Sequence, residues 1–358
     1  MIENKIPLCR PEFTIEMKEA AIHALENEHF VLGESVFKFE KEFAKYIGTK
    51  YAVSVNSGTS ALELSMIAIG IKKSERVITT PNSFIATANS ILMAGGMPVF
   101  SDVKQSDGNV DENLIKIDGE KGIIPVHIYG NPCNIESILS IAKENNIFVV
   151  EDACQAHGAE FRGRKVGSIG DVGCFSFYST KNMTVCGDGG MITTNREDIA
   201  NTAAKLRDCG RVSKYEHDMI GFTKRLNTVN AAIGRIQLRM LDKWNSRRSD
   251  IAEIYKKILP NSYLLEKQKF GNSVYHIFAI KHPNRDNLAK HLSERGISTG
   301  IHYPIPIHKQ DAYIKLGYKI RLPVAEDFSR NVISLPIFPS MTNDQTKYVA
   351  ESVNEVVK

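Results

Sequence analysis

Three short segments carry residue types that could act together on one ligand. Lys181 lies three residues after the segment 174–178, in which side chains alternate between two faces. Asp152 follows the apolar run 147–150 and the acidic residue Glu151. The segment 57–60 reads Ser-Gly-Thr-Ser. An amine can bind a carbonyl carbon covalently, and a carboxylate can hold a protonated ring nitrogen. A turn of small residues at the start of a helix can bind a phosphate through free backbone N–H groups.

Each segment also has an ordinary explanation when it stands alone. A lysine at the start of a loop is usually solvated, an acid after a strand often caps the next helix, and Ser or Thr before a helix is a common cap. Taken together, Lys181, Asp152 and the 57–60 turn fit one pocket for pyridoxal 5′-phosphate. This cofactor needs an amine, an anion site and an acid that keeps its ring nitrogen protonated.

The elements that must position these groups alternate between strands and helices. Short apolar runs predict strands at 51–55, 76–79, 98–100, 122–127, 147–150, 174–178 and 190–193. Helices are expected between them at 61–69, 84–93 and 135–144. Strands separated by helical crossovers predict a mostly parallel sheet covered on both faces, an α/β fold that brings strand ends to one edge.

A second, smaller α/β domain is predicted after a long helix at 228–259. Its apolar residues recur at three- and four-residue steps, and Pro260 follows its end. Beyond it we expect a strand at 275–280, a helix at 286–295 and a strand at 297–302. The predicted division is a large cofactor-binding domain at 1–240 and a smaller domain at 241–358.

The composition of the 358 residues narrows the function classes. Hydrophobic residues make up 42% and charged residues 24%, and the net charge of +4 is spread along the chain, so neither nucleic acid nor a membrane is expected as a partner. The six cysteines show no CxxC pair, so we expect free thiols, no metal site and a cytoplasmic protein. No GxGxxG motif follows an early strand, which disfavours a nicotinamide dehydrogenase.

Beyond these residues, nearly the whole chain resembles the fold-type I sugar aminotransferases known as the DegT/DnrJ/EryC1/StrS family. The matching segments are 39–44, 57–62, 125–130, 151–159, 175–182 and 231–238. The resemblance implies an aminotransferase that uses pyridoxal 5′-phosphate bound to Lys181 as a Schiff base. By the same resemblance, Asp152 pairs with the ring nitrogen and Gln155 with the phenolic oxygen. The other implied cofactor contacts are Gly58, Thr59, Ser60 and Ser176 at the phosphate and Phe84 on the ring.

The resemblance also implies a homodimer with active sites at the interface, where the segment 221–225 reaches the partner's site. Three positions depart from the family pattern. Thr223 stands where many relatives have an asparagine that contacts the neighbouring phosphate, and threonine reaches less far. Cys154 replaces a usual alanine, which we expect to change packing only, and Asn227 replaces a frequent aspartate.

The implied reaction moves an amino group from glutamate to a keto-sugar, expected to be nucleotide-linked. A sister group that removes a sugar hydroxyl has histidine in place of Lys181, which disfavours that reaction. The segments 187–190, 244–248 and 300–308 resemble relatives that aminate 3-keto sugars, and Tyr303 and His308 are candidate sugar contacts. A 4-keto sugar, a keto-sugar acid and a cofactor-binding regulator without turnover remain alternatives.

Overall fold

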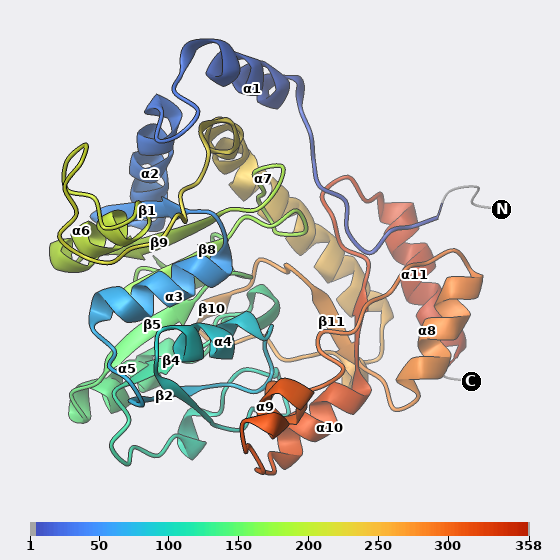
Figure 1. Ribbon diagram of the computed structural model, residues 1–358. Helices are drawn as coiled ribbons and strands as arrows, with labels where there is room; N and C mark the ends of the chain where they lie inside the picture. Colours follow the sequence, from blue (N-terminus) through green and yellow to red (C-terminus); the bar gives the residue numbers. More distant parts are fainter. Residues whose placement is uncertain (1–4, 357–358) are drawn as a thin grey trace.

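The computed structural model describes residues 5–356 and contains a central seven-stranded sheet (Figure 1). The strand order is β1-β9-β8-β5-β4-β2-β3. The bounds, in that order, are Tyr51–Val55, Gly190–Thr194, Val172–Ser176, Phe148–Asp152, Gly122–Ile124, Arg76–Thr79 and Met97–Phe100. The strands from β8 to β3 pair in parallel, whereas β9 runs antiparallel to β8 and β1. The mostly parallel sheet predicted from the sequence is therefore confirmed.

Two layers of helices cover the sheet. One face carries α3 (Gly58–Ile69), α4 (Ala86–Met93) and α6 (Glu197–Leu206), whose apolar side chains pack with Val150 and Cys174. The other carries α2 (Glu34–Ile47), α5 (Ile135–Glu144) and α7 (Thr228–Ile258), which pack with Val149 and Phe175. Because side chains alternate along a strand, Asp152 and Ser176 lie on the side of α3, and Glu151 lies on the side of α5.

The C-terminal part is a smaller assembly next to the sheet (Figure 1). Its strands β11 (Phe278–Lys281) and β12 (Val332–Leu335) pair antiparallel. Its helices are α8 (Arg285–Glu294), α9 (Asp311–Lys315), α10 (Pro323–Asn331) and α11 (Asn343–Glu355). Ile6, near the other end of the chain, packs in its core beside Tyr255. The predicted domain division after residue 240 stays a prediction, and it falls inside α7.

The remaining elements are local. α1 (Ile15–Asn27) packs on α7, and three short strands form a separate sheet: β6 (Glu160–Phe161), β7 (Arg164–Lys165) and β10 (Gly271–Asn272). No helix within residues 5–356 is long and apolar enough to cross a membrane.

The strands expected at 297–302, 122–127, 174–178 and 275–280 differ from the structure. The segment 297–302 forms no strand, because Ile297 bridges only to Ile6 and Gly300 only to Ser334, so it has no continuous partner. The strand expected at 122–127 ends at Ile124, directly before Pro125, which has no N–H to donate to a ladder. The two strands that carry site residues also end two residues away from their expected ends: β5 ends at Asp152 instead of residue 150, and β8 ends at Ser176 instead of residue 178.

Candidate active site

Lys181 lies in the connection between β8 and β9, in a turn where its N–H donates to the carbonyl of Tyr178 at 2.9 Å. Its side chain lines a pocket of about 550 Å³. Burial lowers the pKa of the Lys181 amine, while the neighbouring Cys154 and Asp152 act in the opposite direction. A buried amine with a lowered pKa is more readily deprotonated and is a better nucleophile toward a carbonyl carbon.

The carboxylate of Asp152 enters the same pocket from the end of β5. Its Oδ2 accepts a hydrogen bond from the hydroxyl of Thr87 at 2.7 Å, and its Oδ1 accepts one from the N–H of Cys154 at 3.1 Å. Thr87 belongs to α4 and Cys154 to the loop after β5, so two separate elements hold the carboxylate in one orientation.

The N-terminus of α3 forms another wall of the pocket. Ser57 caps the helix, and its Oγ accepts a hydrogen bond from the N–H of Ser60 at 3.1 Å. A Cβ atom on Gly58 would lie 2.6 Å from Cβ of Ser176 and 3.0 Å from Sγ of Cys154, so only glycine permits this close approach. The first turn of α3, with its unpaired N–H groups and positive dipole end, therefore lies directly against β8.

Both ends of the Gln155 amide are held by hydrogen bonds. Its Oε1 accepts a hydrogen bond from the N–H of Tyr129 at 2.8 Å, and its Nε2 donates to the hydroxyl of Tyr303 at 3.2 Å. Burial raises the pKa of the Tyr303 hydroxyl, so it stays protonated. Phe84 lies at the pocket with its side chain exposed, and its ring centroid is 6.3 Å from that of Tyr303.

Most of the residues predicted from the sequence meet in this pocket. They are Gly58, Thr59, Phe84, Asp152, Gln155, Ser176, Lys181 and Tyr303. Ser60 is buried beside it and bonded to Ser57. Thr223 lies outside the pocket on a strand-like bridge to Asp208.

His308 does not reach the pocket either, contrary to its choice as a sugar contact. It is buried, its Nε2 lies 3.1 Å from Oε1 of Glu326, and its ring is 6.2 Å from that of Phe100. The turn at 307–309 points this side chain into the packing between the C-terminal part and β3. The imidazole of His308 therefore packs in the protein interior and does not line the pocket.

The sequence did not single out several residues that line the pocket, among them Thr87, His276 and His302. Thr87 follows Phe84 by three residues, a spacing that places both on one side of a helical turn. His276 lies just before β11, in a run whose pattern indicated only a strand. No signal in that run distinguishes His276 from an ordinary buried histidine.

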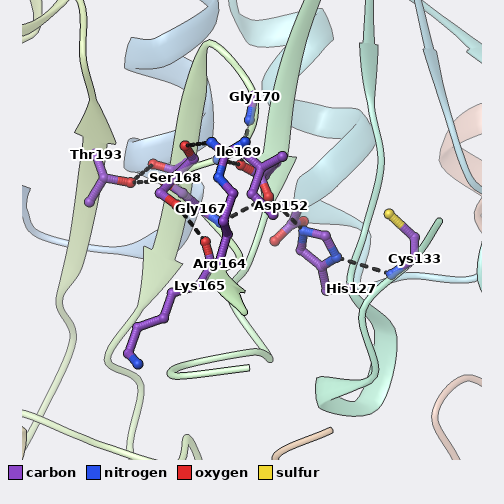
Figure 2. A network of polar contacts seen from close by, with 12 residues as sticks. His127, Cys133, Asp152, Arg164, Lys165, Gly167, Ser168, Ile169, Gly170 and Thr193 are labelled. Atoms are coloured by element: carbon purple, nitrogen blue, oxygen red, sulfur yellow. Dashed lines mark hydrogen bonds and ion pairs between the residues drawn. The ribbon is translucent and has the colours of Figure 1, made fainter. Parts of the chain in front are cut away.

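A second polar network supports the end of β5 from the other face (Figure 2). Oε1 of Glu151 accepts hydrogen bonds from the N–H groups of Ile169 and Gly170, both at 2.7 Å, and Oε2 accepts one from Gly167 at 2.9 Å. His127 donates to Oε2 from Nε2 at 3.1 Å, while its Nδ1 accepts the N–H of Cys133 at 3.1 Å. The backbone N–H of His127 also bonds the carbonyl of Asp152.

These groups match the needs of pyridoxal 5′-phosphate. The pocket combines an amine with a lowered pKa, a carboxylate with a fixed orientation and a helix N-terminus that a Cβ atom would obstruct. These are the groups that bind a carbonyl carbon, a pyridinium nitrogen and a phosphate, so the residues present fit the cofactor.

Comparison with known proteins agrees with this geometry. The family model described as "DegT/DnrJ/EryC1/StrS aminotransferase family" matches residues 11–354. The chain belongs to the DegT/DnrJ/EryC1/StrS aminotransferase family. It is an aminotransferase of the fold-type I class that acts on sugars, and pyridoxal 5′-phosphate is its cofactor.

Two relatives and one solved structure illustrate the similarity. The dTDP-3-amino-3,4,6-trideoxy-α-D-glucose transaminase of Streptomyces venezuelae is 36% identical, over 96% of this chain and 93% of the relative. A protein of Geobacillus stearothermophilus named pleiotropic regulatory protein is also 36% identical, over 95% and 94%. The crystal structure of S. venezuelae DesV in complex with a ketimine intermediate has a TM-score of 0.96 at 34% identity and covers 99% of both chains.

Proposed function

We propose that this enzyme transfers the amino group of glutamate to a nucleotide-linked keto-sugar whose ketone is at position 3. The observation that carries the proposal is the meeting of Lys181, Asp152 and the N-terminus of α3 in one pocket of about 550 Å³. The preference for position 3 is supported by the segments 187–190, 244–248 and 300–308 and by the name of the S. venezuelae transaminase.

Lys181 has two tasks in this proposal. Its amine binds the cofactor covalently, and once an amino donor has displaced it, the free amine carries a proton to and from the substrate carbon. The cofactor, when bound, supplies a ring that accepts the electron pair left on that carbon. The lowered pKa of Lys181 suits both tasks, because a neutral amine can act as a nucleophile and as a base.

The other pocket residues bind and orient the cofactor. Asp152, held by Thr87 and the N–H of Cys154, would keep the ring nitrogen protonated, and Gln155 would donate from Nε2 to the phenolic oxygen. Phe84 would cover a face of the ring. The phosphate would be held by Gly58, Thr59, Ser60 and Ser176, which surround the first turn of α3.

A homodimer in the cytoplasm is part of the proposal. Large apolar side chains that are exposed in the single chain support an interface, among them Phe13, Ile15 and Phe30 at 65%, 72% and 65% exposure and Ile220 at 92%. In such a dimer, Thr223 of one subunit would reach the other subunit's phosphate site. Light scattering on the purified protein would give twice the mass of one chain if this is correct.

The alternatives differ in substrate or in turnover. A 4-keto sugar or a keto-sugar acid would use the same Lys181 chemistry, so only assay separates them from a 3-keto sugar. A cofactor-binding regulator without turnover is not favoured, because Lys181, Asp152 and Gln155 all remain together in the pocket.

The decisive experiment is a panel of nucleotide-linked keto-sugars incubated with glutamate and followed by mass spectrometry. The panel contains dTDP-linked 3-keto and 4-keto 6-deoxyhexoses and UDP-linked 3-keto N-acetylglucosamine. We expect a new amine on a 3-keto member. Amination of the 4-keto members alone would refute the assignment of the ketone to position 3. If no member is aminated, the proposed substrate class is wrong.

A further inference from the structure

His276 forms part of the pocket wall that the C-terminal part of the chain contributes. It lines the pocket together with Ile277, His302 and Tyr303, although only 8% of its surface is exposed. The mechanism described above gives His276 no task. A polar side chain in this position needs either a structural partner at each ring nitrogen or a ligand.

Two backbone carbonyls determine which way the neighbouring amides point. Asn182 donates from Nδ2 to the carbonyl of Val274 at 2.9 Å and to Oδ1 of Asn245 at 2.8 Å. Asn245 in turn donates from its own Nδ2 to the carbonyl of His157 at 2.8 Å. Because a carbonyl only accepts hydrogen bonds, both amide orientations are settled, and Oδ1 of Asn182 must face His276.

This orientation fixes the tautomer of His276. Oδ1 of Asn182 lies 3.1 Å from Nδ1 of His276, and an amide oxygen can only accept, so Nδ1 must carry the proton. Burial lowers the pKa of His276, and Lys181, Arg248, His157 and His302 lower it further, so the ring is neutral. Nε2 is then a bare lone pair. Among residues 5–356 the ring of His276 forms its hydrogen bond through Nδ1, and Nε2 is not one of the fully buried atoms that lack a partner, so it is open to the pocket.

An acceptor without a proton distinguishes between the two substrates of this enzyme. The donor of glutamate is its α-ammonium group, whose nitrogen must react at the cofactor. Its two carboxylates only accept hydrogen bonds, so a bare Nε2 offers them nothing and repels them. The hydroxyl groups of a sugar can donate to it. We propose that His276, held by Asn182, is a specificity-determining residue whose Nε2 accepts a hydrogen bond from a hydroxyl group of the sugar substrate, an inference that rests on the proposed function.

Two substitutions separate this role from a purely structural one. His276→Asn places an amide nitrogen where Nδ1 was, so it keeps the bond to Asn182 but removes the acceptor at the pocket. His276→Gln reaches farther and can place an amide oxygen where Nε2 was, so it restores the acceptor and loses the bond to Asn182. If the role of His276 is structural, His276→Asn should react faster with the amino-sugar than His276→Gln. If His276 recognises the sugar, His276→Gln should react faster.

The test measures the two half-reactions separately on the holoenzyme, through the absorbance of the bound cofactor in single turnovers. One half-reaction uses glutamate. The other runs in the reverse direction, with dTDP-3-amino-3,4,6-trideoxy-α-D-glucose, dTDP-linked 3-amino and 4-amino 6-deoxyhexoses and a UDP-linked 3-amino sugar. The amino-sugar that the unaltered enzyme converts fastest serves as the probe, and His282→Asn, a histidine outside the pocket, is the control.

We expect His276→Asn to lower the rate constant for the amino-sugar about tenfold, the effect of one lost hydrogen bond, and to leave glutamate within about threefold. His276→Gln should recover part of the loss. Equal effects on both half-reactions, or a better asparagine than glutamine variant, would overturn the role of His276. If the unaltered enzyme converts glutamate but none of the amino-sugars, the proposed function fails, and this inference fails with it.

Discussion

Glu151 and Asp152 are neighbours in sequence, yet their carboxylates bind on opposite faces of the sheet. Asp152 accepts the hydroxyl of Thr87 at 2.7 Å on the pocket side, while Glu151 lies 3.1 Å from Nε2 of His127 on the other side. The alternation of side chains along β5 produces this division. One carboxylate is thereby available to a ligand, and the other anchors the strand end that presents it.

Glu151→Gln should lower the free energy of unfolding by about 3 kcal/mol, because an amide nitrogen would face N–H donors at one of the two oxygen positions. Urea denaturation of the purified protein measures the change. The control is Glu136→Gln, since Glu136 is exposed and pairs only with exposed Arg162, and its effect should stay below about 0.5 kcal/mol. A loss for Glu151→Gln as small as that of the control would contradict the anchoring role.

The contribution of Glu151 should also depend on pH. Burial alone raises the pKa of this carboxyl, but His127 and the N–H groups of Gly167 and Gly170 outweigh burial and bring the pKa below its usual value of 4.5. The stabilisation is therefore complete above about pH 4.5 and is lost as the pH falls through the lower folded-state pKa. The difference between the unaltered protein and Glu151→Gln should shrink only in acid, and a difference that shrinks above pH 6 would contradict this assignment.

Lys181→Ala should keep the fold and lose turnover by roughly 10³-fold or more, since the nucleophile and the proton carrier disappear together. Turnover with glutamate measures the loss, and far-UV circular dichroism checks the fold. Lys165→Ala is a suitable control, because Lys165 pairs with Glu160 outside the pocket. Borohydride reduction of the holoenzyme should attach the cofactor to Lys181, and attachment to a different lysine would refute the assignment.

The cofactor-free protein should become more stable when Lys181 is replaced by methionine. Burial lowers the pKa of Lys181 from 10.5, so the unfolded chain binds more protons between the folded-state pKa and 10.5. The stability of the unaltered protein therefore rises with pH across that window, whereas Lys181→Met has no such rise. Thermal unfolding of both proteins should show that the difference in stability in favour of Lys181→Met decreases from pH 7 to 11. A difference that stays constant over this range would contradict the lowered pKa of Lys181.

Thr87→Val should weaken cofactor binding roughly tenfold, because Asp152 loses a charge-assisted hydrogen bond that orients it. Titration of the cofactor-free protein, followed by absorbance, gives the dissociation constant. Thr79→Val is the matched control, since Thr79 is equally buried and donates to the carbonyl of Ile124 away from the pocket. Equal affinity in the two variants would show that Thr87 does not orient the carboxylate.

The sequence by itself determined the fold class and the centre of the site. Short apolar runs that alternate with helical stretches predicted the mostly parallel sheet. Hydrophobic periodicity is a local property, so it can be recognised in one sequence without knowledge of distant contacts. The positions of Lys181 and Asp152 after predicted strands indicated one sheet edge, and the small residues at 57–60 indicated an anion site at a helix N-terminus. The resemblance to the family supplied Gln155. Ends of elements were less accurate, since pairing partners such as Ile6 for Ile297 are far away in sequence.

Only the tertiary structure decided which polar side chains reach the pocket. The local sequence around His308 and around His276 does not indicate which of the two lines a pocket. In the structure, His308 contacts Glu326 and His276 lines the pocket. The difference comes from contacts between distant segments, such as the bond from Asn182 to His276 and the one from Thr87 to Asp152. Side-chain direction depends on packing against residues far along the chain, and no local periodicity encodes that packing.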